Sequence, residues 1–129
     1  MHSHWRFKGH RGKVNAVTFS PDGEKLASCD QQRDIYIWAT KDWSVITKAW
    51  GSFHTASITC LAWNPNSDHI ASGGLDQYIF IWSLSKKTKR TKIERAHQGG
   101  VNNLVWTAGD ALASVGQDSA LKTWKIVLQ

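Results

Sequence analysis

The sequence contains no apolar run long enough to cross a membrane. Its longest apolar stretches are four or five residues, whereas a spanning helix needs roughly 20. Residues 1–6 contain no apolar segment of the kind found in a secretory signal peptide. The only cysteines, Cys29 and Cys60, do not make a disulfide framework and fit a reducing compartment. These absences favour a cytoplasmic protein.

Nucleotide-binding and metal-binding motifs are also missing. Neither GxGxxG nor GxxxxGK[ST] occurs in the chain. His2 and His4 have no cysteine or carboxylate nearby to complete a metal site. We therefore expect no cofactor and no bound metal. What the chain does have is tryptophan, eight in 129 residues, and a net charge of +6.

The positive charge is concentrated between residues 86 and 95. Glu94 is the only acid among six cations there: Lys86, Lys87, Lys89, Arg90, Lys92 and Arg95. Two interpretations stay open, an edge strand whose lysines prevent aggregation and a patch for an acidic partner surface. Nucleic acid is disfavoured as a partner because no aromatic residues are interleaved for base stacking.

A periodicity near 43 residues organises the whole sequence. A histidine recurs at intervals of 44 and 43, and a tryptophan at intervals of 44 and 42. The positions are His10, His54 and His97, followed by Trp38, Trp82 and Trp124. Between them lie short alternating segments separated by polar turns, a pattern typical of antiparallel strands. The period is that of a four-stranded β-propeller blade.

We therefore predict an all-β chain of three four-stranded antiparallel propeller blades, with no helix. Repeat 1 covers residues 9–52, repeat 2 covers 53–95 and repeat 3 covers 96–129, while residues 1–8 are expected to be an outermost strand that closes the last blade. Propellers have about four to eight blades, so three cannot close a ring. Either the chain is the tail of a longer one, or copies join head to tail into a homo-oligomer. A dimer of six blades is preferred over a trimer of nine.

These features resemble the WD-repeat family, whose blades share a hydrogen-bonded network of His, Ser, Asp and Trp. The resemblance places that structural network on His10, Ser28 and Trp38, on His54, Ser72, Asp76 and Trp82, and on His97, Ser114, Asp118 and Trp124. In the first copy Gln32 stands where the aspartate is expected. We therefore expect the first blade to lack a charge-assisted hydrogen bond and to be the loosest.

One branch of the family is more similar than the rest. Residues 69–76, 79–84 and 96–102 resemble the C-terminal end of the actin-interacting protein 1 family. That resemblance implies a role in disassembling actin filaments together with cofilin, and hence a cytoskeletal location. The alternative is a generic WD-repeat assembly scaffold unrelated to actin.

We predict a binding module rather than an enzyme. A Ser, a His and an Asp recur in each repeat, whereas a catalytic triad is needed only once. Loops at the two rims of the blades are the expected binding surfaces, because rim loops vary while blades hold them in place. The candidate partner-binding residues are Arg11, Lys13 and Arg33 on one rim, and Trp43, Lys86, Lys87 and Lys89 on the other.

Overall fold

The computed structural model describes residues 9–47, 53–86 and 89–128. Within these ranges no α-helix occurs, and the prediction of an all-β chain is confirmed. The eleven strands are β1 (Val14–Phe19), β2 (Lys25–Asp30), β3 (Ile35–Ala39), β4 (Val45–Thr47), β5 (Ile58–Trp63), β6 (His69–Gly74), β7 (Ile79–Ser83), β8 (Arg90–Ile93), β9 (Val101–Ala108), β10 (Ala111–Gly116) and β11 (Leu121–Lys125).

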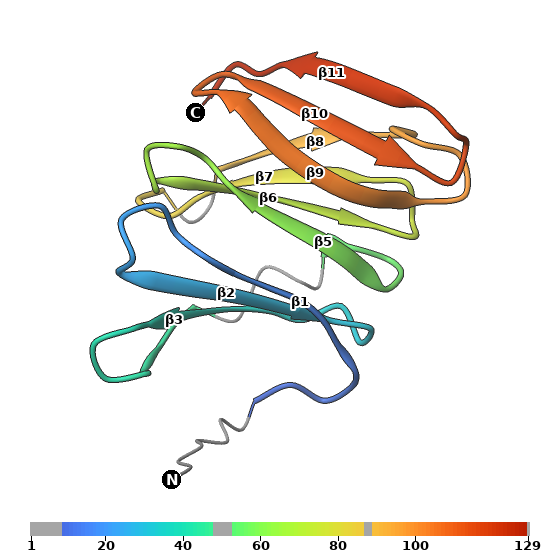
Figure 1. Ribbon diagram of the computed structural model, residues 1–129. Helices are drawn as coiled ribbons and strands as arrows, with labels where there is room; N and C mark the ends of the chain where they lie inside the picture. Colours follow the sequence, from blue (N-terminus) through green and yellow to red (C-terminus); the bar gives the residue numbers. More distant parts are fainter. Residues whose placement is uncertain (1–8, 48–52, 87–88, 129) are drawn as a thin grey trace, which may run out of the picture.

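The strands form three antiparallel sheets that follow one another along the chain. Their strand orders are β1-β2-β3-β4, β5-β6-β7-β8 and β11-β10-β9. Figure 1 shows the sheets stacked face to face as successive blades, from blue at the N-terminal end to red at the C-terminal end. The third sheet has three strands among the described residues. Residues 1–8, predicted to complete it, lie outside the described ranges.

Strand pairing follows the same register through most of every blade. An aromatic residue at or near the end of each first strand pairs with the aliphatic residue near the start of the second, in Phe19–Leu26, Trp63–Ile70 and Trp106–Leu112. The pairing also shifts by one residue near the opposite end of each of these strand pairs. The third blade has one further shift, between Ala111 and Leu112. Such a β-bulge increases the local twist of a strand. Equal spacing in the sequence therefore becomes similar geometry in the three blades.

The hydrophobic core lies between the blades. One buried cluster joins blades 1 and 2 around Ile37 and Trp82, and a second joins blades 2 and 3 around Ile81 and Leu112. An indole hydrogen bond accompanies each cluster. Trp63 Nε1 donates to the Thr18 carbonyl at 3.0 Å, and Trp106 Nε1 donates to the Ala62 carbonyl at 2.9 Å. Each blade is thus fixed to the preceding one by apolar packing and by side-chain hydrogen bonds, among which the indole bond recurs at both contacts.

A chain of hydrogen bonds ties the loop before β5 to the interior of the second blade. Trp82 Nε1 donates to Ser72 Oγ at 2.9 Å, and Ser72 Oγ lies 2.8 Å from His54 Nε2. His54 Nδ1 donates to Asp76 Oδ2 at 2.9 Å, because a carboxylate can only accept. Trp82, Ser72 and His54 are almost fully buried. The four side chains thus serve as hydrogen-bond partners for one another in the interior of the blade.

The third blade repeats this chain. Trp124 Nε1 donates to Ser114 Oγ at 2.9 Å, and Ser114 Oγ lies 2.8 Å from His97 Nε2. His97 Nδ1 completes it by donating to Asp118 Oδ1 at 2.8 Å.

In the first blade the expectation of a missing carboxylate is wrong. His10 Nδ1 donates to Asp30 Oδ2 at 2.7 Å, and His10 Nε2 lies 2.6 Å from Ser28 Oγ. Asp30 is fully buried, and its Oδ1 also accepts the backbone N–H of Gln32 at 2.9 Å. Asp30 pairs with Val14 as Gly74 pairs with Ile58 in the second blade. The carboxylate that binds His10 therefore comes from residue 30, two residues before the expected position at Gln32. The first blade keeps a charge-assisted hydrogen bond.

Candidate functional site: a basic and aromatic groove

A groove opens beside the outer half of blade 2, where an aromatic strand pairs with a basic one. Strand periodicity places Tyr78 and Phe80 on one face of the chain segment that leads into and forms β7. In β8 the same rule places Arg90 and Lys92 together. Phe80 pairs directly with Lys92 across the two strands. Aromatic and cationic side chains are consequently brought to one surface.

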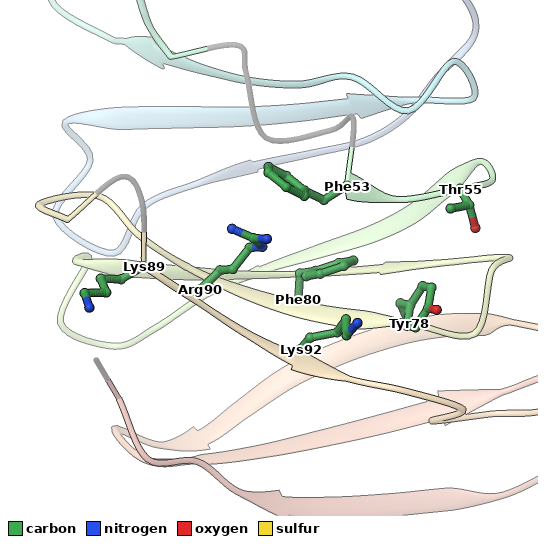
Figure 2. Close-up of a pocket in the computed structure, with 7 residues that line it drawn as sticks. All are labelled: Phe53, Thr55, Tyr78, Phe80, Lys89, Arg90 and Lys92. Carbon is green, nitrogen blue, oxygen red and sulfur yellow. The ribbon is translucent and has the colours of Figure 1, made fainter.

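The loop before β5 forms the other wall of this groove. Figure 2 shows Phe53 and Thr55 approaching from that loop toward the side chains of β7 and β8. The cavity measures about 530 Å³. We call it the basic–aromatic groove, and its seven lining residues are Phe53, Thr55, Tyr78, Phe80, Lys89, Arg90 and Lys92.

Cation–π contacts order the basic side chains of the groove. The guanidinium carbon of Arg90 lies 3.8 Å from the centroid of the Phe53 ring. Lys92 Nζ lies 5.5 Å from the centroid of the Tyr78 ring, and it also lies 3.1 Å from Glu94 Oε1. Both ring distances are within the roughly 6 Å over which a cation is attracted to an aromatic face. The positive charges are therefore held against the groove wall.

An aromatic cluster continues from the groove into the core. The rings of Phe53 and Trp82 lie 5.7 Å apart, and those of Phe80 and Trp82 lie 5.2 Å apart and nearly parallel. Phe80 also meets the His54 ring edge to face at 4.8 Å. Phe53 nevertheless keeps 43% of its surface exposed. One wall of the groove is thus anchored to the hydrogen-bonded network of blade 2 and still presents a large apolar ring to a partner.

The candidate residues of the first rim lie near the loops that carry His10 and His54. Arg11 binds Asp34 through two hydrogen bonds of 2.9 and 3.0 Å, and the contact raises the pKa of the guanidinium. Arg33 adopts a left-handed backbone (φ 71°) and approaches the His54 carbonyl at 3.5 Å. Lys13 is exposed. None of these three cations lines the basic–aromatic groove.

The candidate partner-binding residues of the second rim do not lie together at one site. Trp43 is half-buried in the turn between β3 and β4, where its backbone N–H donates to the Ala39 carbonyl at 2.7 Å. Lys86 is exposed in the turn between β7 and β8. Lys87 lies outside the described residues. Lys89 alone of the seven predicted contact residues lines the groove.

Most of the groove was missed by sequence reasoning. Phe53, Tyr78, Phe80, Arg90 and Lys92 were not among the predicted contact residues. Arg90 and Lys92 belong to the basic stretch that the sequence analysis singled out, and their spacing of two on a short strand signals a shared face. That Phe53 lies against this face depends on a contact between loop and strand that spacing alone does not reveal.

The serines of the repeated networks are unsuited to nucleophilic attack. Ser72 Oγ is fully buried and is engaged by both an imidazole and an indole. The cysteines are similarly enclosed. Burial raises the pKa of the Cys29 thiol to about 12 and that of Cys60 to about 11. Since the thiolate is the reactive form, neither thiol is activated.

The described residues contain no helix that could span a membrane. They also contain no group of three or more His, Cys, Asp or Glu arranged to hold a metal ion.

The model of the family described as WD domain, G-beta repeat, matches residues 2–39 and 50–83, more than half of the chain. The chain belongs to the WD-repeat family. Repeat 3 lies beyond the matched ranges, yet its His97–Asp118 and Ser114–Trp124 bonds reproduce those of repeat 2.

Curated relatives cover most of this WD-repeat chain. The 66 kDa stress protein of Physarum polycephalum is 43% identical over 118 residues, which are 92% of this chain and 20% of that protein. Actin-interacting protein 1 of Drosophila melanogaster is 39% identical over 119 residues, 91% of this chain and 19% of that protein. Actin-interacting protein 1-2 of Arabidopsis thaliana is 33% identical over 121 residues, 93% and 20%. The chain spans about a fifth of the length of these relatives.

Solved structures support the blade architecture. The WD40 repeats of RRP9 superpose with a TM-score of 0.84 at 20% identity, over 92% of this chain and 37% of that one. U3-55K superposes with a TM-score of 0.83 at 20% identity, over 92% and 38%. At such identities the likeness establishes the propeller fold alone.

Proposed function

We propose that this WD-repeat protein-interaction module binds actin filaments and acts with cofilin in their disassembly, in the cytoplasm and without catalysis of its own. The observation that supports the proposal most directly is the 39% identity to a protein named actin-interacting protein 1 over nearly the whole chain. The exposed cations Lys86 and Lys89 supply a basic surface for an acidic partner.

Filament co-sedimentation tests this proposal. The chain should pellet with actin filaments, and adding cofilin should increase the amount of actin left in the supernatant. The variant Lys86→Glu/Lys89→Glu should associate more slowly and with a flatter salt dependence, because rim charges act mainly on encounter.

A matched variant separates local from general charge effects. Lys41→Glu/Lys125→Glu changes the net charge equally and alters two exposed lysines outside the candidate partner-binding residues. An equal effect of both variants would show that only net charge matters. If the unmodified chain stays in the supernatant, the actin role is wrong and a generic assembly scaffold remains.

We also propose that a polypeptide of these 129 residues self-associates head to tail, as a dimer of six blades rather than a trimer of nine. The outward face of β1 exposes Val17 and Phe19 by 62% and 58%, and the third blade exposes Val105 and Leu121 by 57% and 70%. Apolar sheet faces of this kind are stabilised by packing against another blade.

A further inference from the structure

We propose that the basic–aromatic groove binds an extended acidic segment of a partner protein, with an aromatic side chain of that segment held against Phe53 and Tyr78. This rests on the proposed role as a protein-interaction module but does not require the partner to be actin. The groove lies on the outer part of blade 2, and Lys89 is the one rim residue singled out by the sequence that lines it.

The charge of the groove selects an acidic occupant. Its lining includes three cations, Lys89, Arg90 and Lys92, and no carboxylate. Glu94 pairs with Lys92 but is not part of the lining. All three cations are exposed, and with Lys92 paired to Glu94 the groove keeps a net positive charge from Lys89 and Arg90.

The contact of Arg90 with the Phe53 ring leaves the guanidinium able to bind a carboxylate. Its guanidinium lies over the Phe53 ring at 3.8 Å, which occupies the flat face of the group. Carboxylates bind along the edge of a guanidinium, through two parallel N–H donors. Stacking and carboxylate recognition therefore use different sides of Arg90, and the stacking fixes the orientation of the donors beforehand.

The aromatic part of the groove selects an apolar anchor next to the acids. Phe53 is 43% exposed, and Tyr78, which lines the same cavity, is half-buried. The cavity of about 530 Å³ is large enough for a phenylalanine side chain together with its backbone, since small-molecule pockets occupy roughly 300–1,000 Å³. Buried aromatic anchors surrounded by polar contacts are the usual source of binding energy at interfaces.

The spacing of the cations favours an extended peptide. Arg90 and Lys92 are two residues apart on one strand, so their side chains project about 6.5–7 Å apart on the same face. An extended peptide presents its own alternate side chains at the same interval. A segment with two glutamates at alternating positions, followed two residues later by a phenylalanine, matches this surface, because Tyr78 lies two residues beyond Phe80, the partner of Lys92.

Fluorescence anisotropy with a synthetic peptide tests the proposal on the full chain. The probe is a fluorescein-labelled peptide in which serines alternate with glutamate, glutamate and phenylalanine, in that order. Matched peptides replace both glutamates by glutamine or the phenylalanine by serine. The probe should bind, and each replacement should weaken binding by about tenfold or more, because charge pairing and the apolar anchor both contribute.

Variants locate the binding site. Arg90→Glu/Lys92→Glu should weaken binding of the glutamate peptide at least about tenfold, because like charges then face each other. Tyr78→Ser should weaken the phenylalanine peptide and leave the serine peptide unchanged. Lys41→Glu/Lys125→Glu, with the same change in net charge, should bind the probe as the unmodified chain does. Urea unfolding midpoints identify any variant whose loss of binding follows from unfolding.

Three results would overturn the proposal. The glutamine and glutamate peptides would bind equally, or the two double variants would weaken binding of the probe equally. The third is a single-stranded oligothymidylate that displaces the probe at a lower concentration than the unlabelled peptide does. Filament co-sedimentation distinguishes this proposal from the actin role. If the chain binds the peptide but not the filaments, the actin role is wrong and the groove proposal stands. If it binds the filaments but not the peptide, only the groove proposal is wrong.

Discussion

Asp30 and His10 form a buried pair 2.7 Å apart, and Asp30 occupies the strand position that Gly74 occupies in the second blade. A Cβ atom added at Gly74 would lie 3.0 Å from His54 Nδ1. A side chain at that position thus points directly at the imidazole. The first blade therefore has its carboxylate, Asp30, where the second blade has Gly74, and it has Gln32 where the second blade has Asp76.

This exchange predicts the behaviour of three variants. Asp30→Gly should lower the free energy of unfolding by about 1–3 kcal/mol, because it leaves a buried imidazole without its acceptor. Gln32→Asp alone should not stabilise, since it adds a second carboxylate beside Asp30. Asp30→Gly/Gln32→Asp rebuilds the arrangement of blades 2 and 3 and should recover most of the loss. Urea unfolding measures all three, and a double variant no more stable than Asp30→Gly would show that the positions are not interchangeable.

Trp82 should contribute to stability through both its size and its N–H group. It is 1% exposed and donates to Ser72 at 2.9 Å. Trp82→Ala should cost about 3–5 kcal/mol, as large buried truncations do. Trp82→Phe keeps most of the packing and should cost less. An unchanged urea midpoint for Trp82→Ala would contradict the assignment of this residue to the structural network.

Acid should weaken the chain partly through Asp76. Burial opposes ionisation of this group, but the hydrogen bond and the charge of His54, together with backbone N–H donors, outweigh it and hold the pKa of Asp76 below its ordinary value. When the folded-state pKa is lowered, ionisation of the group contributes its full stabilisation at any pH above the unfolded-state pKa of about 4. That contribution is lost as the pH falls through the folded-state pKa.

The variant Asp76→Asn isolates that contribution. It should be less stable than the unmodified chain at pH 7, and the difference should shrink as the pH is lowered below about 4. Free energies of unfolding in urea from pH 7 to pH 2.5 measure the effect. Parallel curves over the whole range would show that Asp76 does not titrate with folding.

Self-association should respond to Phe19. Phe19 corresponds in register to Trp63 and Trp106, each of which donates an indole N–H to the preceding blade. Phe19→Trp should tighten a head-to-tail contact by supplying the missing donor, whereas Phe19→Asp should loosen it. Light scattering at micromolar concentration measures both. A well-folded species of 14.5 kDa for the unmodified chain would contradict the contact.

The blades were predictable because their signals are periodic. Histidine and tryptophan recur at nearly constant intervals, and every strand lies between turn residues at similar offsets. The carboxylate of the first blade was not predicted, because alignment by spacing compares Gln32 with Asp76. The paired deviation was nevertheless visible: an acid replaces glycine at position 30 in the same repeat that loses its acid at position 32.

The groove was less predictable because it depends on contacts between segments. A run of cations indicates a surface, but it does not reveal which aromatic rings lie beside it. The pairing of Phe80 with Lys92 depends on the register of β7 and β8, which the length of the intervening turn leaves open. The position of Phe53 depends further on how the loop before β5 meets the blade.

The indole bonds between adjacent blades have a consequence for the order in which the chain opens. Among the described residues each blade is tied only to its sequence neighbours, so opening should spread inward from the two outer blades as it does in linear repeat proteins. All residues of β6 and β7 are buried, whereas β1 and β11 contain no buried residue. Amide protons of β6 and β7 should therefore exchange last, and Phe80 is the groove residue that lies on this slowest-opening part.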